Sequence, residues 1–305
     1  MKKFLVRSLV FLLPALLVLA LAEAYVRNIP CSYQYKDQWI EAHGKQVSTL
    51  ILGNSHAFFD LRPSAFADST FNLSNVSQRL EHDYFLLQRY AQSCPYLSRV
   101  ILVADNSNLF DPPMEDDEPG REAYYQLYMH YKRPSDPLAF LSSWGSFTPY
   151  PLELSYINSF WAKVTRQWQG KGLSCDSLGW GVDDKAELRN PIDFTPERVR
   201  SHHFHDWPST FRNVVALHRI AAWCQRHHIT LYLLMPPVTQ SYTQKANKWQ
   251  LNLVNSVALR CQQRYGAIVV DYSCDSRFSD LDFFDTDHLN NLGATKFSNI
   301  LSVEL

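Results

Sequence analysis

The chain has 305 residues, of which 46% are hydrophobic and 19% are charged. This composition is that of a globular protein with one large core or two smaller ones, and it excludes a largely disordered chain. The formal net charge at pH 7 is -1, and because nucleic-acid-binding proteins usually carry a basic surface, we exclude that class. Aromatic residues make up 14% of the chain, which suits a thick core or a groove that binds carbohydrate.

The first 27 residues have the pattern of an export signal. Basic residues precede an apolar run from Leu9 to Ala22, and such charges stay on the cytoplasmic side of a membrane. Small residues permit cleavage at Ala20, Ala22 or Ala24, whereas the almost unbroken apolar stretch 4–26 favours an uncleaved membrane anchor. In both cases residues 28–305 are expected outside the cytoplasm.

The remaining chain alternates between predicted strands and helices. After a connector at 27–45, the expected order is a strand at 47–55, a strand at 70–74, a helix at 78–94 and a strand at 98–106. The span 111–209 is rich in Pro, Gly, Asp and Trp and lacks sustained periodicity, so we interpret it as an irregular or helical insertion. A helix near 211–228, a strand at 229–237, a helix near 243–265, a strand at 267–273 and a helix near 291–301 follow.

This alternation predicts the fold class. Strands that alternate with helices form a mainly parallel sheet with helices on both faces, which is a three-layer αβα arrangement. The expected core of this single α/β domain comprises residues 46–110 and 210–305, interrupted once by the insertion.

Polar residues follow the ends of the predicted strands, where functional groups gather in open parallel sheets. Ser55 follows the first strand, and Asp285 precedes His288 by three residues after the fifth. Serine is a weak nucleophile until a base takes its proton, and that base works best when a carboxylate orients it. We therefore expect Ser55 as nucleophile, His288 as base and Asp285 as the residue that orients His288.

An oxyanion that forms during this chemistry needs hydrogen-bond donors. The expected donors are the Ser55 backbone N–H and a group from the second or third strand end. Asn106 is the first choice, and the Ser74–Asn75 backbone or the Asn75 side chain is the next.

The motifs Gly53-Asn54-Ser55-His56 and Asp285-x-x-His288 resemble the first and last blocks of the SGNH or GDSL hydrolase superfamily. The stretches "RNIPCSYQYK", "LGNSHAFFDLRP", "FNLSNVSQRLEHDY" and "DFFDTDHLNNLGATKFS" are similar to membrane-anchored bacterial proteins that modify polysaccharides. Alginate O-acetylation proteins and the D-alanyl transfer protein of teichoic acids are of this type. The similarity covers roughly residues 25–110 and 210–305.

The resemblance implies a flavodoxin-like SGNH fold and an exported serine esterase or O-acyltransferase that forms an acyl-serine. It implies an inner-membrane protein with its domain on the periplasmic side, a polysaccharide substrate, an acyl donor supplied by a membrane acyltransferase, and neither cofactor nor metal. The second block has no glycine, and the third reads Ala104-Asp105-Asn106-Ser107. These departures keep a second hypothesis open, a catalytically inactive protein that binds glycan or takes part in assembly of a polysaccharide system.

Three local alternatives accompany this interpretation. His56 either binds substrate or supports the turn that carries Ser55. Asp287 is a second candidate partner for His288. The segment "SHHFHDW" suggests a metal site through its histidines and aspartate, but no fourth ligand is evident and a solvated loop is favoured (His202, His203, His205 and Asp206).

Six cysteines suit an oxidising compartment, in which one to three disulfides can form. No CxxC pair occurs, which argues against a structural zinc site and thioredoxin-like chemistry. For Cys224, on a helical face, a buried free thiol is an equal alternative.

Overall fold

The computed structural model describes residues 2–131, 152–182 and 204–305. The chain divides into two compact units. Unit 1 consists of residues 1–35 and 118–173, and unit 2 consists of residues 36–117 and 174–305. Helix α2 (Ser32–His43) begins in unit 1 and continues into unit 2.

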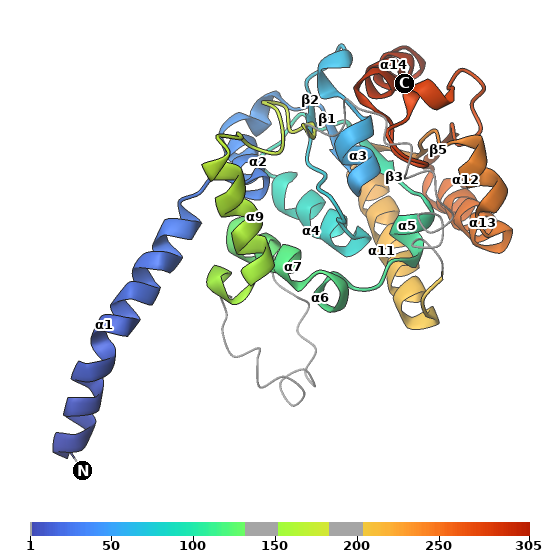
Figure 1. Cartoon of the computed structure of the whole chain (residues 1–305). Coiled ribbons are helices and arrows are strands. Elements are labelled where there is room, and N and C mark those ends of the chain that lie inside the picture. Colours follow the sequence, from blue (N-terminus) through green and yellow to red (C-terminus); the bar gives the residue numbers. More distant parts are fainter. Residues whose placement is uncertain (1, 132–151, 183–203) are drawn as a thin grey trace. The chain divides into compact units, whose positions relative to one another are not determined.

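Unit 2 is built on a five-stranded sheet in which all strands are parallel (Figure 1). The strands are β1 (Thr49–Leu52), β2 (Thr70–Asn72), β3 (Arg99–Val103), β4 (Thr230–Met235) and β5 (Ile268–Asp271), in the order β2-β1-β3-β4-β5. The α/β class and the parallel sheet predicted from the alternation of elements are therefore confirmed. In this order the direction of winding reverses between β1 and β3, which is where doubly wound sheets bind ligands.

Unit 2 contains the helices predicted near 78–94, 211–228 and 291–301, together with short helices that were not predicted. In chain order, its helices are α3 (Ser55–Asp60), α4 (Leu80–Tyr90), α5 (Asn106–Phe110), α6 (Met114–Asp117), α11 (Trp207–Arg226), α12 (Gln240–Lys245), α13 (Lys248–Tyr265) and α14 (Asn291–Glu304). The prediction of one helix near 243–265 is wrong, because the chain breaks at Ala246 and Asn247. The Asn247 side chain accepts a hydrogen bond from Trp249 N and starts α13, a role that asparagine fills better than a helix interior.

Helices cover both faces of the sheet. α11 packs against both α4 and α13, whereas α3 packs against α14. The α14 side joins strand residues to the last helix in one core cluster (Ile51, Ile101, Val103, Leu234, Phe297 and Leu301). The alternate strand residues are also fully buried (Leu50, Leu52, Val100, Leu102 and Leu233). Because successive strand side chains point to opposite faces, both faces of the sheet are buried, as in other parallel sheets.

Unit 1 contains α1 (Lys2–Arg27), α7 (Pro119–Tyr128), the short 3-10 helix η3 (Glu153–Ser155) and α9 (Ile157–Trp168). The expected insertion 111–209 is divided between the units. Residues 174–182 belong to unit 2, where Asn72 N donates to Leu178 O at 2.9 Å and Gly181 N donates to Phe58 O at 2.8 Å. Trp180 is part of the buried core of that unit.

All six cysteines lie within the described residues, and all six are free thiols. Four of them are buried (Cys94, Cys175, Cys224 and Cys261). The fold therefore does not use the one to three disulfides that the sequence allowed, and Cys224 follows the alternative of a buried thiol.

Candidate active site

Ser55 stands at a sharp turn between β1 and α3. Gly53 has φ +124°, and a Cβ there would lie 3.0 Å from Val103 Cβ and 3.2 Å from Ala57 Cβ. Asn54 then caps α3, since its side chain accepts a hydrogen bond from His56 N at 3.1 Å. Glycine is needed here because side chains rarely adopt that φ and the neighbours leave little space. The turn presents Ser55 as the first residue of α3, where backbone N–H groups have no partner within the helix.

His288 and Asp285 meet Ser55 from the other end of the chain. His288 Nε2 lies 2.8 Å from Ser55 Oγ, and His288 Nδ1 lies 3.1 and 3.0 Å from the two Asp285 carboxylate oxygens. Asp285 is therefore the hydrogen-bond partner of His288, whereas Asp287 Oδ1 is 3.8 Å from Nδ1. With Nδ1–H donated to Asp285, Nε2 is free to accept the Ser55 hydroxyl proton. The structure thus joins the three residues in the geometry of a nucleophile, a base and an orienting acid.

The loop that carries His288 is fixed at several points. Asp285 Oδ1 accepts the backbone N–H groups of Asp287 at 3.0 Å and His288 at 2.7 Å. The buried Asp60 Oδ1 accepts Leu289 N–H at 3.0 Å, and Asn290 caps α14. Burial raises the pKa of Asp60 well above its usual value, with the favourable effect of His56 too small to offset it.

His56 is tied to two other carboxylates. Its Nδ1 contacts Asp105 at the end of β3, and its Nε2 lies 3.3 Å from Asp287 Oδ2. The His56 and His288 rings lie 4.4 Å apart between centroids. Burial lowers the pKa of His56, but Asp105 and Asp287 outweigh that effect and the net pKa lies well above the usual value. His56 is therefore a buried link between the ends of β1 and β3 and the His288 loop.

Asp105 completes this link. Burial raises its pKa, yet the charge and hydrogen bond of His56 prevail and lower the pKa to about 2. Asp105 also caps α5 by accepting Asn108 N–H at 2.9 Å. Asn54 Nδ2 donates to Ser107 Oγ at 2.6 Å, which fastens the Ser55 turn to the start of α5. Sequence reasoning named Asp105 only within the third motif block, because its partner His56 is 49 residues away in the chain.

The predicted oxyanion donors lie at the ends of two different strands, Asn106 after β3 and Ser74 and Asn75 after β2. Asn106 is the first residue of α5, directly after Asp105, and is buried. Ser74 and Asn75 are buried after β2. Ser74 N donates to Asn72 Oδ1 at 3.0 Å, so this backbone N–H is already used within the β2 end. Asn72 in turn donates to Ala57 O at 2.7 Å, which connects β2 to α3.

The buried carboxyl group of Asp83 also supports the turn that carries Ser55. Gly53 N donates to Asp83 Oδ1 at 2.8 Å, and Gln78 Nε2 donates to the same oxygen at 2.5 Å. Burial raises the pKa of Asp83 to about 7, because these hydrogen bonds compensate only part of the desolvation.

Among the described residues, His56, Asp287 and His288 could each offer one ligand atom to a metal ion, with these atoms within 4.8 Å of one another. The same side chains already bind each other, Asp105, Asp285 and Ser55, so a metal would have to break those hydrogen bonds. In the histidine-rich segment, His202 and His203 lie outside the described residues. Asp206 caps α11 by accepting Ser209 N–H at 2.7 Å, which is an ordinary structural role.

No family model matches the sequence, and no curated protein matches it either.

Proposed function

We propose that this protein is an exported serine-dependent esterase or O-acyltransferase of the SGNH type. It would act on acyl groups, with acetyl as the expected group, of a cell-surface or exported polysaccharide. The observation that carries the proposal is the chain of contacts from Ser55 Oγ through His288 to Asp285. The strand order, which is that of flavodoxin-like sheets, and the position of Ser55 beside the β1/β3 switch point support it.

The first half of the reaction forms an acyl-enzyme. His288 Nε2 takes the proton of Ser55 while Oγ attacks the ester carbonyl carbon, and Asp285 stabilises the resulting imidazolium. The Ser55 backbone N–H and the Asn106 side chain are the proposed donors to the oxyanion. When the C–O bond to the alcohol breaks, His288 returns the proton to the leaving oxygen, and the acyl group remains on Ser55.

The second half restores the serine. A water molecule or a sugar hydroxyl gives its proton to His288 and attacks the acyl carbon, and Ser55 Oγ leaves with the proton from His288. Water as acceptor gives an esterase, and a sugar hydroxyl gives an acyltransferase. The resemblance to polysaccharide-modifying proteins favours transfer, with the donor supplied by a membrane acyltransferase and the domain on the periplasmic side of a bacterial inner membrane.

The direct test is hydrolysis of a chromogenic acetyl ester by the full chain in detergent. Ser55→Ala and His288→Ala should each lower kcat by a factor on the order of 10⁴ or more, because the three residues act as a unit. Intact mass after mixing with the ester should show an acetyl group on the parent and none on Ser55→Ala.

Asp285→Asn and Asp287→Asn form a matched pair within this test. Asp285→Asn should lower kcat by a factor on the order of 10⁴, because the amide holds His288 in the wrong tautomer. Asp287→Asn should cost less, because it leaves the contacts between His288 and Asp285 in place. If the parent is as inert as Ser55→Ala, both toward esters and toward an acetyl donor with oligosaccharide, the result would favour the glycan-binding hypothesis. Two observations support that hypothesis: the Ser74 N–H is already used in a hydrogen bond, and the second block lacks its glycine.

A further inference from the structure

The end of helix α1 is built into unit 1. The Glu23 carboxylate accepts the backbone N–H groups of Glu153 at 2.9 Å and Leu154 at 3.0 Å. Lys163 Nζ donates to Val26 O at 2.9 Å, so it satisfies a carbonyl in the last turn of α1. Val26 is 1% exposed, whereas the apolar residues of the preceding turns are largely exposed. The last turns of α1 are therefore part of a folded structure.

This junction contains a buried ionic group that depends on α1. Lys163 lies 3.0 Å from Glu153 Oε1 and donates to Tyr128 OH at 2.9 Å. A chain cleaved after Ala24 would lose the Glu23 carboxylate and leave the start of η3 without its acceptors. Since removing one partner from a buried polar network is costly, the structure favours a retained helix over a cleaved signal.

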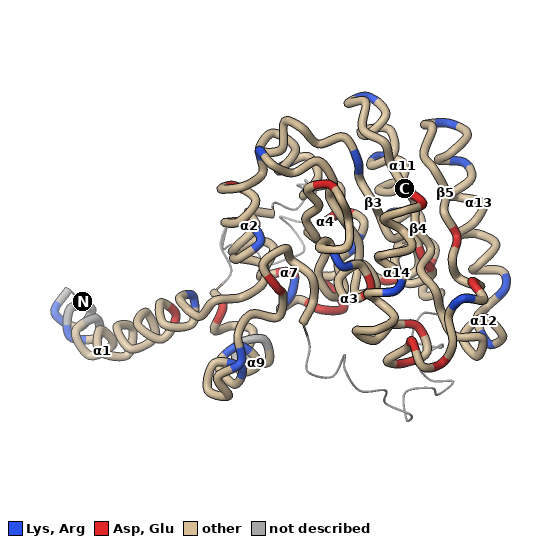
Figure 2. The backbone as a smooth tube through the Cα atoms, turned by 90° about the horizontal axis from the view of Figure 1, so that it is seen from above, with Lys and Arg blue, Asp and Glu red and all other residues tan. Residues whose placement is uncertain are grey.

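The charged residues of α1 limit where a bilayer can lie relative to the last turns of this helix. One helix in the described part of the chain is long and apolar enough to span a membrane or to act as a signal sequence. Its charged residues lie near its two ends (Figure 2). The uncharged run Ser8–Ala22 rises about 22 Å at 1.5 Å per residue, which is shorter than a hydrocarbon layer of about 30 Å. A bilayer of that thickness around α1 therefore extends past the end of this run, towards Arg7, towards the turn that begins at Glu23, or towards both.

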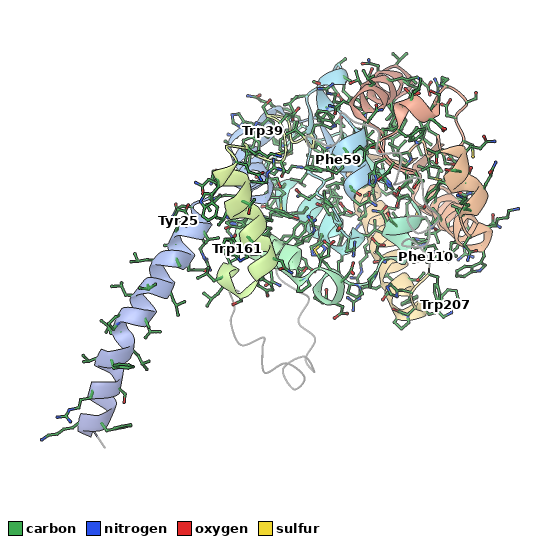
Figure 3. All side chains as sticks on the ribbon, in the orientation of Figure 1. Tyr25, Trp39, Phe59, Phe110, Trp161 and Trp207 are labelled. Atoms are coloured by element: carbon green, nitrogen blue, oxygen red, sulfur yellow. The ribbon has the colours of Figure 1, made fainter. Side chains whose placement is uncertain are left out.

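Exposed aromatic side chains lie at the level of the last turns of α1. Tyr25 OH donates to Gln167 Oε1 at 3.2 Å, which places α9 beside the last turns of α1. Trp161 and Trp168 of α9 are 48% and 71% exposed, and their rings lie 6.2 Å apart. Figure 3 labels Tyr25 near the end of α1 and Trp161 on α9, two helices that contact each other. Tryptophan and tyrosine favour the headgroup region of membranes, because their rings are apolar and their N–H or O–H groups are polar.

We infer that α1 is retained as a membrane anchor and that α9 lies against the bilayer surface beside it, with Tyr25, Trp161 and Trp168 in the headgroup region. The partner of this exposed surface is the lipid bilayer, because the surface is continuous with the apolar sides of α1. The inference is independent of the proposed catalytic chemistry.

Tryptophan fluorescence of the full chain in vesicles of phosphatidylcholine and phosphatidylglycerol tests the surface contact. Lipids brominated near the headgroup should quench the parent, and the double variant Trp161→Phe with Trp168→Phe should lose most of that quenching. The matched control, Trp207→Phe with Trp249→Phe, removes two tryptophans of unit 2 that are 58% and 43% exposed and should lose much less. Equal quenching of the parent and the first double variant would overturn the surface contact.

Intact mass of the protein extracted from bacterial membranes tests the retained anchor. The expected mass includes residues 1–27, with or without the initiator methionine. A mature chain that begins after Ala20, Ala22 or Ala24 would overturn the inference.

Discussion

The two histidines of the site have different hydrogen-bond partners. His56 contacts carboxylates through both ring nitrogens, and an imidazole can donate from both nitrogens only when it is protonated. His288 contacts a carboxylate through Nδ1 and the Ser55 hydroxyl through Nε2, so one nitrogen can act as acceptor. Despite the burial of His56, Asp105 and Asp287 raise its pKa. The protonated form of His56 offsets the charge of Asp287, which lies beside His288.

His56→Gln should lower the free energy of unfolding by about 3–5 kcal/mol near pH 6, because it leaves buried carboxylates without their cation. The folded-state pKa of His56 is raised, so its contribution is complete below about pH 6.5, its unfolded pKa, and declines as the pH rises through the folded value. The Asp105 contribution is present above about pH 4 and declines as the pH falls towards the folded pKa of about 2. The loss should therefore be largest between about pH 4 and 6.5.

Urea unfolding from pH 3 to 9 measures this loss, with His43→Gln as the control at an exposed histidine. A difference between parent and His56→Gln that does not change with pH would show that the ion pairs are not its source.

Ser55, His288 and Asp285 were accessible to sequence reasoning because each follows a strand or lies within a short motif. The partners of His56 were not, since Asp287 is 231 residues away in the chain and only the folded sheet brings the two together. Burial also decides the raised pKa of Asp60 and Asp83, and no local pattern reports it.

At the scale of elements, the β1–α3 turn determines where the Ser55 side chain points. Gly53→Ala should lower the free energy of unfolding by about 1–3 kcal/mol, because the backbone is strained for alanine at φ +124°. It should also lower ester hydrolysis, because the added Cβ pushes against β3 and α3 and moves Ser55.

Gly266→Ala is the matched variant for this turn. Gly266 ends α13 at φ +73° with no atom within 4 Å of an added Cβ. It should cost about 1–2 kcal/mol from backbone conformation and leave kcat unchanged. Urea unfolding and ester hydrolysis of both variants provide the comparison, and equal activities would show that the Gly53 turn does not position Ser55.

The strands and the helices α4, α11 and α14 followed from apolar runs and spacing, because each carries its own periodicity. The break at Asn247 and the division of the span 111–209 did not. Asn247 can either continue a helix or cap the start of a new one, and the spacing of apolar residues does not distinguish these two roles. Residues 174–182 join unit 2 through contacts with β2 and α3, which are remote in sequence.

At the scale of the whole molecule, burial keeps four of the six thiols unreactive. It raises the pKa of Cys94 and Cys224 to about 12, so little thiolate forms at neutral pH. Cys274 is the exposed cysteine. Ellman's reagent should therefore react rapidly with Cys274 in the native protein.

The same reagent should count six thiols after denaturation without reductant, and the melting temperature should not change with reductant. A count below six would reveal a disulfide and contradict the free thiols of the fold.

The sequence by itself determined the α/β class, the apolar N-terminal helix and the two ends of the chain that supply Ser55 and His288. These depend on local periodicity and short spacing, which neighbouring residues express. Only the tertiary structure decided that Asp285 rather than Asp287 hydrogen-bonds His288 Nδ1, that His56 joins Asp105 to Asp287, that the cysteines stay free, and that the end of α1 belongs to a folded unit. Each of these depends on desolvation and on partners from distant segments, which exist only once the chain is packed.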